Sequence, residues 1–172
     1  MIADLNISKF LMISHLGSRR LRAPWWSDED WENAQKTATT LSDYCKAKLE
    51  ADEYFTALAM KREEDRQGGD SAFQAIGLRP GLLSAEPATK KVQLGHTAVK
   101  GSVSREDVAI VADKLLARSD TRGMIDLLGG DEPVDEAIER VARSQVSALD
   151  GEDVDAIRKR FADETLTLEF RP

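Results

Sequence analysis

The sequence predicts a mainly α fold: a helical bundle with one long N-terminal helix or helical hairpin, a glycine-rich middle segment and a minor β component. Composition favours helices, because charged residues make up 32% of the chain and aromatic residues only 6%. A local pattern favours them too. A capping residue, an acidic first turn and an apolar residue follow one another at 27–31, 104–108 and 150–154, and this order is typical of a helix start.

The N-terminal region, residues 1–67, is expected to contain the longest helix. No glycine or proline interrupts residues 27–67, and basic residues close that stretch as acids open it. One helix of this length would run roughly 60 Å, which exceeds the diameter of a domain of this size. The stretch therefore bends, breaks near 37–43 into a hairpin, or protrudes. Before it, an amphipathic helix is predicted over 7–16, with Gly17 as its C-terminal cap.

Apolar residues follow a 3-4 spacing along the long helix, from Trp31 to Leu58. Lys48 interrupts this spacing, so the pattern falls short of a coiled coil. Cys45 lies on the apolar seam, where a packed and unreactive thiol is expected.

Glycine and proline punctuate residues 68–103, which are therefore predicted to be a connector without long helices. Residues 90–100 within it suit a β-hairpin, because Gly95 stands at the first central position of a type II′ turn. Val92 would then face Val99 across the hairpin.

The C-terminal region, residues 104–172, is predicted to be an acidic helical bundle that ends in a strand. Its helices are expected over 104–118, 121–128, 131–149 and 150–162. Apolar and polar residues alternate over 165–170, as in a half-buried strand. That strand would pair with the hairpin or add to the sheet edge of a neighbouring chain. All three regions are expected to form a single domain.

Charge and cysteine content limit the function classes. The net charge is −7, with the excess acid near the C-terminus, and such a surface disfavours nucleic acid and anionic membranes as partners. Cys45 is the only cysteine, so no intrachain disulfide is possible, which agrees with a reducing cytosol. No apolar stretch suits a signal peptide or a membrane anchor. We expect a cytoplasmic protein, or a virion-associated one if its origin is a phage.

No residue pattern predicts a catalytic, cofactor-binding or metal site. His15 and His96, the only histidines, lack spaced partners for a metal ion or a nucleophile. Lys100 precedes Gly101, the reverse of the order in a phosphate-binding loop. The acids at 150–155 lack the glycine and the closing glutamate of a calcium loop. We therefore expect no enzyme, no cofactor and no metal ion.

Two groups of residues are candidates for an interface. One is the basic and aromatic cluster, formed by Arg19, Arg20, Arg22, Trp25 and Trp26. The other is the apolar face of the C-terminal strand, formed by Leu166, Leu168 and Phe170. Arginine and tryptophan are enriched in interface hot spots, which favours a docking role for the first group. Alternatively, its tryptophans staple the next helix and fill the core.

These features favour a non-enzymatic interaction or assembly subunit, either a phage-type structural component or a bacterial adaptor, which self-associates or binds a protein partner. A nucleic-acid-associated regulator is one alternative, with the arginines facing a phosphate backbone. An acidic inhibitor of a nucleic-acid enzyme is a second. The third is an enzyme with a carboxylate site that no motif reveals.

Overall fold

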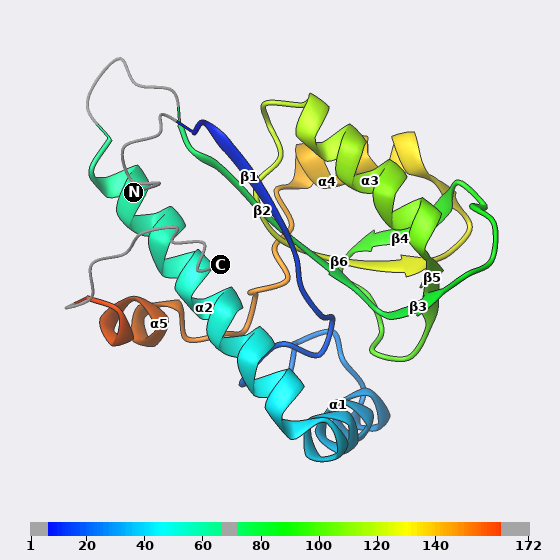
Figure 1. Ribbon diagram of the computed structural model, residues 1–172, viewed down its shortest axis with the longest axis horizontal. Coiled ribbons are helices and arrows are strands. Elements are labelled where there is room, and N and C mark those ends of the chain that lie inside the picture. The colour runs from blue at the N-terminus through cyan, green and yellow to red at the C-terminus, as the bar shows by residue number, and fades with distance from the viewer. Residues whose placement is uncertain (1–6, 67–71, 163–172) are drawn as a thin grey trace, which may run out of the picture.

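The computed structural model describes residues 7–66 and 72–162 and shows an α/β fold, in which helices cover both faces of a central sheet (Figure 1). The sheet has five strands in the order β1-β2-β6-β4-β7. Their bounds are Lys9–Ile13 (β1), Gln74–Pro80 (β2), Gly123–Gly129 (β6), Lys91–Gly95 (β4) and Glu132–Pro133 (β7). Strands β1, β2 and β6 are parallel, whereas β4 runs antiparallel to β6 and β7.

Two layers of helices enclose the sheet. The first layer contains α1 (Asp28–Thr40) and α2 (Ser42–Glu64), which connect β1 to β2, and α5 (Val154–Arg160), which packs against α2. The second contains α3 (Arg105–Ala117) and α4 (Val134–Ser144) (Figure 1). Parallel strands must be joined by a crossover, usually a helix, so the pairing of β1, β2 and β6 dictates these layers. A second, two-stranded parallel sheet consists of β3 (Leu82–Ser84) and β5 (Ser102–Ser104).

Strands β2 and β6 are buried on both faces, because each face is covered by helices. Towards the layer of α3 and α4 they present the fully buried residues Ile76, Leu78, Ile125 and Leu127. Towards the opposite layer, Ala75 and Met124 pack with Phe55 of α2. The core therefore lies on both sides of the sheet.

The expectation of a mainly helical bundle is wrong, because the sheet is the centre of the fold. The stretch 121–128, predicted as a short helix, contains most of β6, and 7–16, also predicted as a helix, contains β1. A strand buried on both faces shows no alternation of polar and apolar residues, so its apolar run resembles a helix segment. Strand β2 lies within 68–103, where only a connector was expected.

The described part of the stretch 27–67 forms two helices that meet at Leu41, whose φ of −118° and ψ of 47° are not helical. Ser27 and Ser104 are N-caps, as the helix-start pattern predicts, whereas the third expected start at Asp150 is wrong, because α5 is capped by Asp153. In place of the hairpin over 90–100, β4 pairs with β6 and β7. Residues 96–100 form no strand; instead, the Thr97 carbonyl accepts hydrogen bonds from two indole N–H groups.

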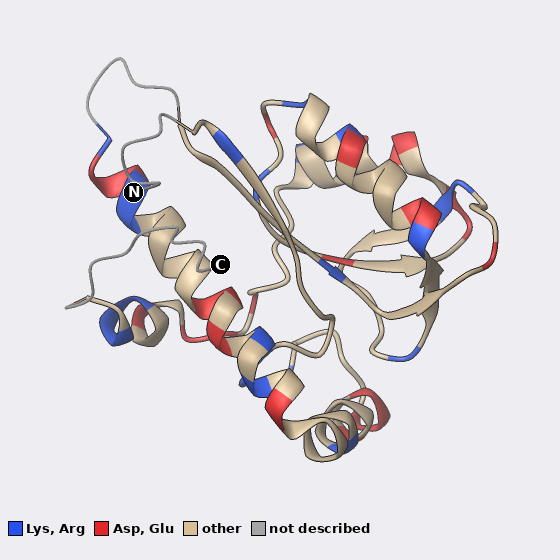
Figure 2. Ribbon diagram, in the orientation of Figure 1, with Lys and Arg blue, Asp and Glu red and all other residues tan. Residues whose placement is uncertain are grey.

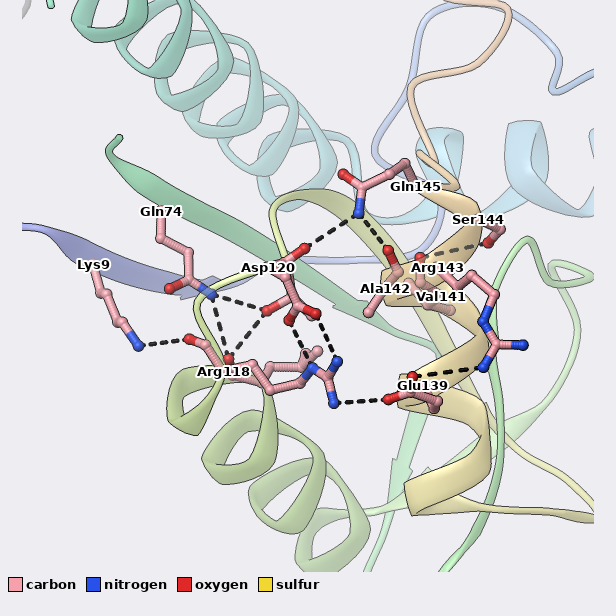
Figure 3. Close-up of polar contacts among 12 residues, drawn as sticks. Lys9, Gln74, Arg118, Asp120, Glu139, Val141, Ala142, Arg143, Ser144 and Gln145 are labelled. Atoms are coloured by element: carbon pink, nitrogen blue, oxygen red, sulfur yellow. Dashed lines mark hydrogen bonds and ion pairs between the residues drawn. The ribbon is translucent and has the colours of Figure 1, made fainter. Parts of the chain in front are cut away.

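Polar contacts connect the amino ends of β1 and β2 to the last turn of α3 and to the segment that follows it. Lys9 Nζ donates to the carbonyl oxygens of Leu116 (2.9 Å) and Arg118 (2.5 Å), and Gln74 Nε2 donates to Thr121 Oγ1 (2.9 Å) (Figure 3). The carboxyl ends of the parallel strands point the other way. No helix in the described part of the chain is long and apolar enough to cross a membrane.

Two neighbouring leucines of α3 test which side of this helix faces the sheet. Leu115 is fully buried against the sheet, whereas Leu116 is 39% exposed. Leu115→Ala should lower the free energy of unfolding by about 2–5 kcal/mol, because it leaves a cavity in the core. Leu116→Ala should lower it by less than about 1 kcal/mol. Urea denaturation checks both values, and equal losses would contradict this orientation of α3.

Candidate functional site

The carboxyl ends of parallel strands are where open α/β sheets bind ligands, because the loops that follow the strands meet there. At the end of β1, the Ile13 carbonyl accepts a hydrogen bond of 3.1 Å from Lys48 Nζ of α2. Lys48 Nζ also lies 5.9 Å from the ring centroid of Tyr44, one helical turn earlier. The His15 ring packs on the Tyr44 ring with the centroids 5.6 Å apart. We call this group, Ile13, His15, Tyr44 and Lys48, the Tyr44 site.

Tyr44 can donate a proton from this position. Its side chain is accessible, since the residue is 46% exposed. Partial burial raises the pKa of the Tyr44 phenol, and the neighbouring Cys45 and Asp52 raise it further. Burial also lowers the pKa of His15, with added repulsion from Arg79 and Lys48. Near neutral pH the site therefore combines a protonated phenol, a neutral imidazole and an ammonium group.

A group of buried polar side chains lies between α2 and the sheet, below the Tyr44 site. We call it the buried charge cluster, and its members are Ser14, Ser18, Asp52, Arg79 and Asp126. Charged residues otherwise gather mainly on the helices and loops (Figure 2). Arg79 of β2 and Asp126 of β6 are register partners with no exposed surface, and Arg79 Nε lies 3.3 Å from Asp126 Oδ1. This ion pair lacks the alignment of a hydrogen bond.

Burial dominates the electrostatics of this cluster. It raises the pKa of Asp126 to about 7. The positive charges of Arg79 and Arg19 lower this pKa, and the carboxylate of Asp52 raises it. Burial raises the pKa of Asp52 as well, and Arg79 and the hydroxyl of Ser14 partly oppose this. The cause is the cost of holding a carboxylate away from water.

The residues singled out from the sequence do not form one exposed patch. Arg19 is buried and donates to the carbonyl oxygens of Leu21, Ala148 and Asp150. Its guanidinium lies 5.1 Å from the ring centroid of Trp26, which is also buried. These contacts suit the structural alternative, in which the cluster fills the core.

The other members of the cluster also bind within the chain. Arg20 pairs with Glu53, and Arg22 donates to the Trp26 carbonyl. Trp25 stacks on His96 with ring centroids 3.6 Å apart. Leu166, Leu168 and Phe170 lie outside the described residues.

Sequence reasoning missed Tyr44 and Lys48. Their i, i+4 spacing puts both on one helix face, but such pairs occur in many helices. The pair becomes informative only once 9–13 is known to be a parallel strand, because β1 brings its carboxyl end to that face.

The described residues contain no cradle for the phosphate groups of a ligand. Such a cradle joins a glycine-rich turn to the exposed N-terminus of the next helix. The turn after β1 has only Gly17, and α1 begins far beyond it at Asp28. A capping box between Ser27 and Asp30 closes that helix end. Helices α3 and α4 also begin with acidic first turns, which repel phosphate.

Metal ligands are not gathered either, since the described ranges hold no cluster of three or more His, Cys, Asp or Glu side chains suited to an ion. The three parallel strands moreover lie across the sheet in the same order as along the chain, β1-β2-β6. The reversal of strand order at which doubly wound sheets bind their ligands is therefore not among the described strands.

The raised pKa of Asp126 predicts a pH-dependent stability. Between about pH 4 and pH 7 the folded state binds more protons than the unfolded state, so the free energy of unfolding falls as pH rises. The contribution amounts to at most about 4 kcal/mol. Asp126→Asn should flatten this fall in urea denaturation between pH 5 and pH 8. Asp120→Asn, at an exposed carboxylate paired with Arg118, should keep the original slope. Equal slopes for both variants would contradict the assignment.

Comparisons with known proteins agree with the fold. Residues 2–119 match the model of a family described as NAD(P)H-binding. The oxidoreductase ylbE of Lactococcus lactis has 20% identity and a TM-score of 0.59, over 83% of this chain and 55% of that one. A Bacillus halodurans protein assigned as an NAD-dependent epimerase/dehydratase has 25% identity and a TM-score of 0.55, over 81% and 54%. The chain thus spans about half the length of both proteins. No curated protein matches it in sequence.

These findings correct the functional expectations. A non-enzymatic assembly subunit, a nucleic-acid regulator and an acidic inhibitor were all wrong, as was the expectation of no enzyme, because the family match and the shared fold point to NAD(P)H-linked enzymes. Strands β1 and β6 were interpreted as helices and β2 as part of a connector, so the α/β fold that these proteins share was missed. With most of its length matched, the chain belongs to the NAD(P)H-binding family.

Proposed function

We propose that this chain supplies the proton-transfer groups of an NAD(P)H-linked oxidoreductase or epimerase site, with Tyr44 as the general acid and base. The observation that carries the proposal is an accessible phenol beside an ammonium group at the carboxyl end of a parallel strand. Membership of the NAD(P)H-binding family supports it.

The chemistry follows from what a carbonyl needs when it is reduced. Addition of hydride to the carbon leaves a negative charge on the oxygen, which must take up a proton. The Tyr44 O–H bond breaks, and its proton forms a new O–H bond with the substrate oxygen. The electron pair of the broken bond stays on the phenolate oxygen. In the reverse direction the phenolate removes the proton from an alcohol. The substrate class is therefore a small carbonyl compound or the corresponding alcohol.

Lys48 stabilises the charge that this transfer creates. Its ammonium group is held at the Ile13 carbonyl by a hydrogen bond, so it does not depend on substrate for its position. Its Nζ lies 5.9 Å from the Tyr44 ring centroid, where a cation attracts a phenolate and so opposes burial, Cys45 and Asp52, which raise the pKa of the phenol. A preorganised positive charge of this kind lowers the barrier because no group has to reorient during the reaction.

A dinucleotide also needs a place for its pyrophosphate, and the described residues do not fit that group. The turn after β1 lacks the glycines, and the helix ends carry acids. We therefore assign proton transfer, and not the binding of the pyrophosphate, to the described residues of this chain.

Tyr44→Phe tests the proton donor. The assay uses reduced nicotinamide mononucleotide, a hydride donor without a pyrophosphate, and follows reduction of a panel of small aldehydes and ketones. The chain should accelerate reduction of at least one of them, and Tyr44→Phe should lower that acceleration by about 10²-fold or more.

Tyr54→Phe is the matched control, because Tyr54 is the other tyrosine of the same helix and its ring packs on Phe161. This variant should keep the original rate. Equal rates for Tyr44→Phe and the unmodified chain, or no acceleration of any carbonyl, would contradict the proposal.

A further inference from the structure

The loop after β1 is held in place by the neighbouring strand. Ser14 N donates to the Leu78 carbonyl and Leu16 N to the Pro80 carbonyl, which continues the pairing of β1 with β2. The Leu16 carbonyl accepts a hydrogen bond of 2.7 Å from Arg79 Nη2. Leu16 is buried, so this charge-assisted bond is shielded from water. The loop carries His15, whose ring packs on Tyr44.

Acidic groups of two other elements act on Arg79. Asp126, its register partner on β6, pairs with its guanidinium, with 3.3 Å between Nε and Oδ1. Asp52 of α2 acts on it from the helix layer, and the Ser14 hydroxyl lies beside the same carboxylate. One guanidinium thus joins β2, β6 and the loop after β1.

Stability alone does not account for such a cluster. Replacing a buried ion pair by apolar side chains of similar size is often neutral or stabilising, because desolvation offsets most of the attraction. Several polar atoms of the cluster, including Arg79 Nη1 and both carboxylate oxygens of Asp52, have no hydrogen-bond partner in the described structure. Because burying these polar groups costs so much desolvation free energy, we expect the cluster to have a role beyond packing.

We propose that Arg79 is a positioning residue for the Tyr44 site: it holds the Leu16 carbonyl and thereby places the His15 ring against Tyr44, while Asp126 fixes the orientation of its guanidinium. The inference rests on the proposed function of Tyr44. Its geometry can nevertheless be measured without turnover, so the two proposals fail independently.

The test is the nuclear Overhauser effect between the ring protons of His15 and Tyr44, whose centroids are 5.6 Å apart. Phe10 and Phe55, at 5.5 Å, give an internal reference between the sheet and α2. Arg79→Met combined with Asp126→Val removes both members of the ion pair, so neither of these two is left buried without the other. This double variant should lose most of the His15–Tyr44 signal and keep the Phe10–Phe55 signal.

If the double variant does not fold, Arg79→Lys tests the positioning role of Arg79 instead. It keeps the positive charge but has a single point of attachment, so it cannot reach the Leu16 carbonyl and Asp126 in the same geometry. It too should weaken the His15–Tyr44 signal selectively. Gln74→Met is the matched control, since it removes a buried polar contact at the amino end of the same strand (Figure 3) and should leave both signals intact.

Retention of the His15–Tyr44 signal in a folded Arg79 variant overturns the proposal, as does a parallel loss of both signals, which would make Arg79 merely structural. In the carbonyl assay, Arg79→Lys should lower the rate by up to about 10²-fold, the effect of misplacing a site by about 1 Å.

Discussion

The parallel pairing of β1, β2 and β6 is the constraint on which the rest of this structure depends. Parallel neighbours force the chain back across the sheet through helices, so both faces become covered and the strands become buried on both sides. The same pairing brings the carboxyl ends of the strands to one edge. Tyr44 and Lys48 lie there because α2 begins at that edge and runs back over the sheet.

The buried charge cluster shows how stability and site geometry are balanced. An apolar pair in place of Arg79 and Asp126 would cost less desolvation, yet it could not bind the carbonyl oxygen of a loop. The cluster also makes the protein sensitive to pH near neutrality, because burial holds the pKa of Asp126 at about 7. The same few side chains therefore affect both the stability of the core and the position of the loop after β1.

The sequence predicted structure that depends on neighbouring residues, such as helix caps. It did not predict the pairing of strands that lie far apart in the chain. Ser27 and Ser104 were identifiable because a cap bonds only its own first turn. Strands β1 and β2 escaped because their partners lie far along the chain and neither strand alternates in polarity. Lys48 was interpreted as an interruption of an apolar seam, although it marks the site. Only the position of β1 reveals that role.

The central claim is that the described residues provide proton transfer at the strand ends and no cradle for a pyrophosphate. Calorimetric titration of the chain with NADPH and with reduced nicotinamide mononucleotide tests it directly, because the two ligands differ by the adenosine phosphate half. The account predicts dissociation constants that agree within about tenfold, or about 1.4 kcal/mol. Binding of NADPH that is a hundredfold or more tighter would contradict it.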